Sequence, residues 1–266
     1  MSDASSPTGS VDNTPNSPVF GPGTVAMVTG ASSGIGYAIA AALVDRGIRV
    51  IATGRNVPRL DAAHEALGEL LFPIVLDVSD NEAVAALPDS LPVDLRQIDI
   101  LINNAGHDVG GRRAFQDGTA EEWDSIFETN VSGLMRVTHA IAPGMLARGY
   151  GHIINLGSVS GLYTYAGGAA YNASKFAVHG FTEALRKDFA SADIRVTEIL
   201  PGLVRTNFAS NRLKGDKEAA GEFYDRFAAC LYPDDIAASV MFALDQPPHV
   251  NITQLVVEPT LTAHPR

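Results

Sequence analysis

A phenol and an ammonium stand four residues apart in the stretch Tyr171-Asn172-Ala173-Ser174-Lys175. On a helix this spacing places both side chains on one face, one turn from each other. A tyrosine titrates near pH 10. A neighbouring cation that lowered its pKa by about three units, roughly 4 kcal/mol, would make the phenol a usable acid at neutral pH. The motif therefore indicates proton transfer, and the alternative is an ordinary helix surface.

Two further polar residues fall where they could join this pair. Ser158 follows a predicted strand, so its hydroxyl would face the same crevice and could hold a substrate carbonyl oxygen. Asn130 lies at the boundary between two predicted helices, where a kink or a water could link its amide or its backbone to Lys175. Each residue by itself has a structural alternative, and only the combination indicates an active site.

Short apolar runs alternate with helical stretches from residue 24 onward. Predicted strands cover residues 25–28, 49–53, 72–76, 98–102, 152–156, 195–200 and 255–258. Predicted helices cover residues 34–46, 58–67, 81–87, 131–147, 170–189 and 233–244, and another helix follows the capping box Thr119-x-x-Glu122. This alternation predicts a doubly wound parallel α/β sheet with helices on both faces. Ligands of such sheets bind at the carboxyl ends of the strands, where the winding reverses.

A glycine-rich turn joins the first predicted strand to the first helix, from Thr29 to Gly36. Its glycines would let the backbone approach a pyrophosphate, and the helix N-terminus supplies N–H groups and a partial positive charge. Gly54 follows the second strand, at the position where an acidic residue would bind the ribose 2′-hydroxyl of NAD. Arg55 follows and can pair with a 2′-phosphate, so the sequence favours NADP over NAD. The alternative is that Arg55 is a solvated cation.

Two more strand ends carry candidate contacts to a dinucleotide. Asp77 and Val78 follow the third strand, where a carboxylate beside a backbone N–H can read an adenine edge. The alternative role of Asp77 is to cap the helix that begins near Asn81. The small residues and amides of 103–106 suit close approach to a cofactor, or form a plain turn.

Composition argues against several classes of function. The net charge of −11 disfavours nucleic acid and anionic membranes as partners. No apolar run approaches the eighteen or so residues that span a bilayer, and no secretory signal is apparent, so we expect a cytoplasmic protein. Residues 1–23, rich in polar residues and proline, are expected to form a disordered tail before the domain at 24–266. The histidines show no metal-ligand spacing, so no metal site is expected. The sole cysteine, Cys230, excludes an intramolecular disulfide.

The motifs together closely resemble those of the short-chain dehydrogenase/reductase family over about residues 24–258. The residues that carry the resemblance are Thr29-Gly-x-x-x-Gly34-x-Gly36, Asp77, Asn103-Asn-Ala-Gly106, Asn130, Ser158, Tyr171-x-x-x-Lys175 and Pro201-Gly202. The resemblance implies a single Rossmann-type sheet of about seven strands and a nicotinamide cofactor. It also implies that Ser158 and Tyr171 polarise the substrate carbonyl, that Tyr171 donates the proton, that Lys175 binds the nicotinamide ribose and lowers the Tyr171 pKa, and that Asn130 supports a water relay.

With this family in view, a set of cofactor-binding residues can be predicted. They are Gly30, Ser32, Ser33, Gly34, Ile35, Gly36, Arg55, Asn56, Asp77, Val78, Asn104, Ala105, Gly106, Tyr171, Lys175, Pro201, Gly202, Val204 and Thr206. The family resemblance further implies a homodimer or homotetramer.

A narrower similarity links the chain to NADP-dependent 3-hydroxy acid dehydrogenases, which act on serine, allo-threonine and related short acids. Residues 52–55, 151–155, 165–168, 201–204 and 214–216 carry it. Sulfoacetaldehyde reductases are also similar. Residues 205–208 depart from that group's pattern, so a reductase for sulfoacetaldehyde or for bulkier neutral ketones is an alternative. A dinucleotide-binding sensor without turnover is a third hypothesis.

Three loops should border the nicotinamide, at residues 107–115, 162–169 and 203–224. They carry Arg112, Arg113, Arg205, Arg212 and Lys214, and in an acidic chain cations around one mouth indicate an anionic substrate. Arg212 is the first candidate for carboxylate or sulfonate, because a guanidinium forks onto such groups. It joins Ser158 and Tyr171 as a predicted substrate-binding residue. The alternatives are solvated cations, or an apolar wall of Leu162, Tyr163 and Tyr165. Residues from about 205 to 227 are a predicted lid.

Overall fold

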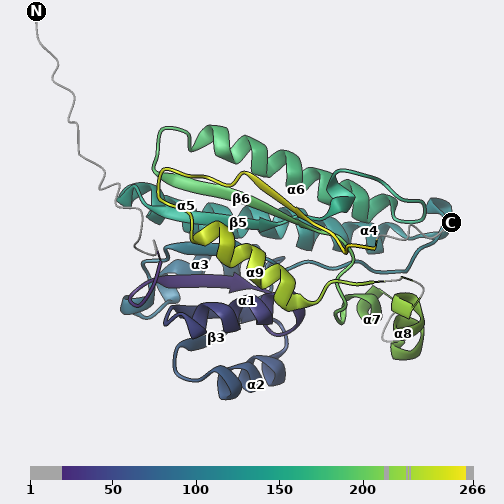
Figure 1. Cartoon of the computed structure of the whole chain (residues 1–266), viewed down its shortest axis with the longest axis horizontal. Coiled ribbons are helices and arrows are strands. Elements are labelled where there is room, and N and C mark those ends of the chain that lie inside the picture. Colours follow the sequence, from purple (N-terminus) through teal and green to yellow (C-terminus); the bar gives the residue numbers. More distant parts are fainter. Residues whose placement is uncertain (1–19, 213–215, 226, 228, 262–266) are drawn as a thin grey trace, which may run out of the picture.

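The seven strands form one parallel sheet in the computed structural model, which describes residues 20–212, 216–225, 227 and 229–261 (Figure 1). The strands are β1 (Val25–Thr29), β2 (Arg49–Gly54), β3 (Leu71–Val75), β4 (Ile100–Asn103), β5 (Gly151–Leu156), β6 (Ile194–Pro201) and β7 (Gln254–Val257). Their order across the sheet is β3-β2-β1-β4-β5-β6-β7, and every pair is parallel. The predicted doubly wound sheet is confirmed, and its winding reverses between β1 and β4.

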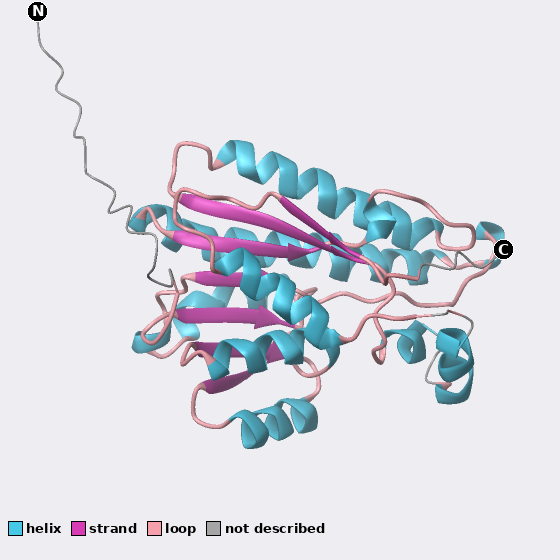
Figure 2. Ribbon diagram, in the orientation of Figure 1, coloured by secondary structure: helices cyan, strands magenta, loops and turns pink. Residues whose placement is uncertain are grey.

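Helices connect the strands and cover both faces of the sheet (Figure 2). They are α1 (Gly34–Asp45), α2 (Val57–Leu67), α3 (Asn81–Ser90), α4 (Ala120–Phe127), α5 (Leu134–Arg148), α6 (Ala169–Asp188), α7 (Phe208–Arg212), α8 (Lys217–Asp225) and α9 (Pro233–Leu244). The predicted capping box opens α4, and Gly47 follows α1 in the left-handed conformation. Among the described helices, none is long and apolar enough to cross a membrane.

Alternate residues of β1, an interior strand of the sheet, divide the core into two layers. Ala26 and Val28 of β1 belong to a cluster with apolar residues of α1, α2 and α9. Val25 and Met27 face the other way, toward a cluster that includes residues of α3, α5 and α6. This follows from the two-residue repeat of a strand that is buried on both faces. The layers hold the strands rigidly and so fix the positions of the loops at their carboxyl ends.

The loop after β6 contains two helices that the sequence did not predict. α7 and α8 lie beyond the carboxyl ends of the strands, apart from the layers that cover the sheet (Figure 1). Lys214 lies outside the described residues between them. The predicted lid therefore corresponds, in its described part, to two short helices rather than to an irregular loop.

Residues 20–23, the inner end of the expected tail, belong to the described structure. Phe20 is almost fully buried, with its ring 5.5 Å from that of Tyr150 and the Arg195 guanidinium 5.4 Å from its centre. The sequence prediction failed because one aromatic residue in a polar segment is enough to attach it to the core. Residues 1–19 lie outside the described part of the chain.

Candidate active site

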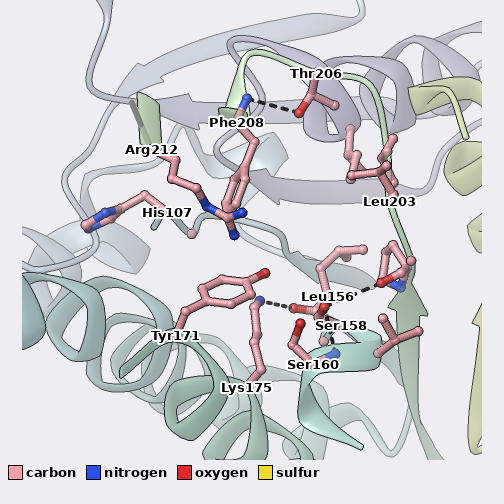
Figure 3. A pocket seen from close by; sticks show the side chains of 18 of the residues that line it. His107, Leu156, Ser158, Ser160, Tyr171, Lys175, Leu203, Thr206, Phe208 and Arg212 are labelled. Carbon is pink, nitrogen blue, oxygen red and sulfur yellow. Dashed lines mark hydrogen bonds between the residues drawn. The ribbon is translucent and has the colours of Figure 1, made fainter. Parts of the chain in front are cut away.

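A cavity of about 890 Å³ opens at the carboxyl ends of the strands. Its walls come from the glycine-rich turn after β1, the loops after β4, β5 and β6, and helices α6, α7 and α8. Ser158, Tyr171 and Lys175 all line it, as do His107 and Arg212 (Figure 3). The structure therefore gathers residues from distant parts of the chain into the crevice that the sequence predicted.

The glycine-rich turn is shaped by close backbone contacts. Gly30 and Gly34 have φ angles of 66° and 58°, in the left-handed region that favours glycine. A Cβ on Gly36 would lie 2.4 Å from the Gly30 carbonyl oxygen and from Asn104 Nδ2, which no side chain could tolerate. Asn104 in turn donates to the Thr29 carbonyl over 2.8 Å, which ties the turn to the end of β4.

The turn fits the phosphates of a dinucleotide. Ser33 precedes α1 but, among the described residues, its side chain caps none of the helix N–H groups, and the first turn carries no acidic residue. Uncapped N–H groups and the positive end of the helix dipole favour an anion at this point. The combination of a glycine cradle and an uncapped helix is what a pyrophosphate requires.

Most of the predicted cofactor-binding residues share this cavity. Those that line it are Gly30, Ser33, Gly34, Ile35, Asn104, Ala105, Gly106, Tyr171, Lys175, Pro201, Gly202, Val204 and Thr206. The others lie in the glycine-rich turn or at the ends of β2 and β3: Ser32, Gly36, Arg55, Asn56, Asp77 and Val78. Their roles stay predictions.

Gly54 ends β2 close to the glycine-rich turn. A Cβ on Gly54 would lie 3.3 Å from Ser32 Oγ. Arg55 next to it is largely exposed, with its guanidinium 3.5 Å from the Asp77 carboxylate. Asp77 does not cap α3 as the alternative prediction had it, because Asp80 accepts the N–H groups of that helix. Burial opposes ionisation of Asp77, but hydrogen bonds from Ser79 and the nearby Arg55 outweigh it and lower its pKa.

Ser158, Tyr171 and Lys175 come from two neighbouring elements. Ser158 follows β5, where its hydroxyl accepts a hydrogen bond from the Ser160 N–H over 3.1 Å. Tyr171 and Lys175 lie one turn apart near the start of α6, and Figure 3 shows both side chains directed toward Ser158. All three side chains are at least nine-tenths buried, so solvent access to them is restricted.

The predicted lowering of the Tyr171 pKa is not produced by the protein groups. Burial, with a further contribution from Tyr165, raises the pKa of Tyr171 well above its usual value, although Arg212 and a hydrogen bond with Ser158 act in the opposite direction. Lys175 points its ammonium at the Leu156 carbonyl, 2.8 Å away, rather than at the phenol. Burial lowers the pKa of Lys175 itself to about 8. The sequence fixes the spacing of the pair but not the depth at which it is buried.

Asn130 lies in a π-helical turn, Glu128–Gly133, that joins α4 to α5. Its side chain accepts from the His107 N–H over 2.8 Å and donates to the His107 carbonyl over 2.9 Å and to Ser174 Oγ over 3.1 Å. The boundary predicted between the two helices is therefore a π-helical turn. The amide contacts His107 and Ser174 rather than Lys175, so only the backbone of Asn130 keeps its predicted link to the lysine.

The four described arginines of the predicted cationic mouth are not simply solvated. Arg212 is buried with its Nε atom 2.6 Å from Asp108 Oδ2, although the Nε–H does not point along hydrogen-bond geometry. Arg113 pairs with Glu122, and Arg205 pairs with Asp225 over 2.8 Å. Arg112 stacks on Tyr165, with 4.4 Å from its guanidinium carbon to the ring centre.

Only two of these arginines line the cavity, Arg112 and Arg212. Asp108 was not singled out from the sequence, since nothing in the spacing of residues 108 and 212 links them. The aromatic residues around Arg212, which include Phe208 and Phe223, were missed for the same reason.

Comparison with known proteins agrees with this geometry. The family model described as short chain dehydrogenase matches residues 24–217. The NADP-dependent 3-hydroxy acid dehydrogenase YdfG of Salmonella typhi is 43% identical over 236 residues, which cover 88% of this chain and 94% of that protein. Sulfoacetaldehyde reductase 2 of Chromohalobacter salexigens is 38% identical over 242 residues, covering 90% and 95%.

A solved structure is similar over nearly the same span. It is described as the closed form of serine dehydrogenase complexed with NADP⁺, with a TM-score of 0.85 and 40% identity, covering 88% of this chain and 94% of that one. The chain belongs to the short-chain dehydrogenase family. It is therefore an oxidoreductase.

Proposed function

We propose that this chain is an NADP-dependent oxidoreductase that interconverts short 3-hydroxy acids and the corresponding 3-oxo acids or semialdehydes. The observation that carries the proposal is the meeting of Ser158, Tyr171 and Lys175 with two arginines in one cavity beside the glycine-rich turn. The 43% identity to a 3-hydroxy acid dehydrogenase and the likeness to a serine dehydrogenase support the substrate class.

Bound NADP supplies a hydride acceptor, or in its reduced form a hydride donor. In the reductive direction the Tyr171 phenol would donate its proton to the substrate oxygen as the carbon gains hydride. In the oxidative direction the Tyr171 phenolate, formed once the phenol has lost its proton, would take the proton of the substrate hydroxyl as the carbon loses hydride. The Ser158 hydroxyl, buried beside Tyr171, holds the substrate oxygen. Lys175 would hold the nicotinamide ribose, and Arg55 would hold the 2′-phosphate, because guanidinium groups pair bidentately with phosphate. Asn130, in the π-helical turn between α4 and α5, would support the proton path.

A lid over the substrate is part of the proposal. Phe208 and Arg212 of α7, together with Phe223 and Tyr224 of α8, line the cavity. Residues from about 205 to 227 would then exclude water once the substrate is bound. Arg212 remains a predicted substrate-binding residue because it lines the cavity.

The test is a substrate panel with purified protein and NADP⁺. Serine and 3-hydroxypropionate should be oxidised, which appears as absorbance of the reduced nicotinamide, and a neutral secondary alcohol should react far more slowly. A preference for the neutral alcohol would overturn the substrate class. The 38% identity to a sulfoacetaldehyde reductase favours one second candidate, reduction of sulfoacetaldehyde, which the same assay reads with NADPH.

Assembly into a homodimer or homotetramer is proposed through α5 and α6. Both helices expose large apolar side chains, with Met135 44%, Leu146 40% and Phe176 42% accessible. Apolar groups of this size on neighbouring helices are costly to leave in water, so a second copy would cover them. Light scattering of the purified chain measures the mass, and a monomer would overturn this part. A cytoplasmic location stays a prediction from the sequence.

A further inference from the structure

The two arginines that line the cavity differ in how their charge is compensated. Arg212 is paired with the buried carboxylate of Asp108. Arg112 forms no ion pair with any carboxylate in the described part of the chain, and it keeps more than a third of its surface accessible. A buried ion pair presents little net charge to its surroundings. An anion entering the cavity is therefore attracted mainly by Arg112.

We propose that Arg112 is the residue that receives the carboxylate of the substrate, and that Arg212 is a positioning residue that holds Tyr165 beneath Arg112. This inference rests on the proposed function and assigns its acid specificity to one side chain. It differs from the prediction made from the sequence, which favoured Arg212.

Aromatic rings hold the Arg112 guanidinium in place. Its carbon lies 4.4 Å from the ring centre of Tyr165 and 5.6 Å from that of Phe223. A guanidinium stacked on a ring keeps the N–H donors along its edge available, and these match the two oxygens of a carboxylate. Stacking also reduces the side-chain entropy lost on binding. Arg112 is thus preorganised for a planar anion.

Arg212 anchors the ring on which Arg112 stacks. Its Nη2 atom donates to Tyr165 Oη over 3.1 Å, while its Nε atom lies against Asp108. Contacts thus run in sequence from Asp108 through Arg212 and Tyr165 to Arg112. Because Asp108 and Arg112 lie on one loop and Tyr165 on another, this network fixes the spacing of two walls of the cavity.

The backbone ties the same two loops together. The Arg113 N–H donates to the Gly167 carbonyl over 3.2 Å. Gly167 has a φ of 78°, and a Cβ there would lie 3.0 Å from the Arg113 nitrogen, so the close approach needs glycine. Arg112 therefore extends from a backbone that is held against the Tyr165 loop.

Two other charged groups at the cavity, Lys175 and Glu258, are not suited to bind the substrate carboxylate. Lys175 is bound to the Leu156 carbonyl beside Tyr171. Glu258 lines the cavity beside Gly202, at the ends of β6 and β7, and would repel a substrate anion there. Burial lowers the pKa of Arg112, but a guanidinium stays protonated at any ordinary pH.

The experiment compares an acid with its uncharged ester. Parent and variants oxidise 3-hydroxypropionate and methyl 3-hydroxypropionate with NADP⁺. Arg112→Gln should raise KM for the acid about tenfold or more, the loss expected for one charge-assisted contact, with little change for the ester. Arg112→Lys keeps the charge but not the planar fork. Its KM for the acid should therefore lie between those of the parent and Arg112→Gln.

Arg113→Gln is the matched control. It removes the same charge from the neighbouring position, but Arg113 pairs with Glu122 and does not line the cavity. Its KM for the acid should equal that of the parent. Melting temperatures of the three variants check that each remains folded.

A binding measurement gives a readout without turnover. Propionate titrated into the NADP⁺-loaded parent should bind more tightly than propionamide, and Arg112→Gln should remove that difference in calorimetry. Equal KM increases for acid and ester, or an unchanged KM for the acid, would overturn the role of Arg112 and leave the proposed function intact. A parent that oxidised neither compound, nor serine, would overturn the proposed function itself and this inference with it.

Discussion

The Lys175 ammonium donates a hydrogen bond to the Leu156 carbonyl over 2.8 Å and lies 5.9 Å from the centre of the Tyr171 ring. The lysine is thus held by the end of β5, beside the phenol but not on it. Burial of the ammonium lowers its pKa to about 8. The protein therefore bears a cost in stability to keep this cation in the cavity.

Because of that cost, we expect the difference in unfolding free energy between the parent and Lys175→Met to depend on pH. The folded pKa of about 8 is below the ordinary 10.5, so between these values the unfolded chain binds more protons and stability rises with pH. Between pH 8 and 10 the parent should gain about 2 kcal/mol of unfolding free energy relative to the variant. Urea unfolding at several pH values measures it. The tyrosines are common to both proteins and cancel, and a flat difference would contradict the buried, charged lysine.

A second prediction concerns Tyr171→Phe. Loss of the hydroxyl removes the only proton donor proposed at the reacting oxygen, so kcat should fall about 10²–10⁴-fold. Binding of NADPH, followed by its fluorescence, should stay close to that of the parent because the ring still packs against Phe208. Turnover at the parental rate in a variant that binds the dinucleotide would refute the role of Tyr171 as acid and base.

The sequence predicts the parallel sheet well because the positions of its strands and helices follow from local signals. Uninterrupted apolar strands, the capping box at Thr119 and the glycine after α1 each act over a few residues, and the structure confirms them. Phe20 and helices α7 and α8 were missed. Their positions depend on contacts with distant residues, such as Tyr150 for Phe20, which no local pattern records.

In the site, too, features set by neighbouring residues can be predicted from the sequence, and features set by distant residues cannot. The one-turn spacing of Tyr171 and Lys175 is readable from the chain, whereas the burial that raises one pKa and lowers the other depends on the tertiary structure. Likewise, Arg212 is recognisable as a cation near the mouth, but its partner Asp108 is more than a hundred residues away along the chain. Charge compensation of this kind cannot be deduced from composition.

A third prediction addresses the choice of dinucleotide. The Arg55 guanidinium is largely exposed after the end of β2, where its ion pair with Asp77 is 3.5 Å long, so it is available to a 2′-phosphate. Arg55→Ala should lower kcat/KM for NADP⁺ relative to NAD⁺ by about tenfold or more. Lys187→Ala, which removes an exposed charge paired with Glu183 on the surface of α6, is the control and should leave the ratio unchanged. A parent that prefers NAD⁺ would contradict the assignment.

A final prediction distinguishes the role of Arg212 from that of Arg112 by the unfolding free energy of the variant Arg212→Met. Arg212→Met leaves the Asp108 carboxylate buried without its counter-charge, which should cost about 3–5 kcal/mol of unfolding free energy at pH 7. Burial already raises the Asp108 pKa, and without Arg212 nothing comparable opposes it. A folded-state pKa above the unfolded value means that stability is lost as pH rises through that range. The deficit should therefore be larger at pH 7 than at pH 5.

Kinetics of the same variant complete the distinction. Because Arg212 holds Tyr165 and lies 5.8 Å from the Tyr171 ring centre, Arg212→Met should lower kcat/KM for the acid and for the ester alike. Asp108→Asn combined with Arg212→Gln removes both charges and should recover part of the lost stability, but not the activity. If Arg212→Met instead raised KM for the acid alone and unfolded like the parent, the carboxylate would belong on Arg212 and not on Arg112.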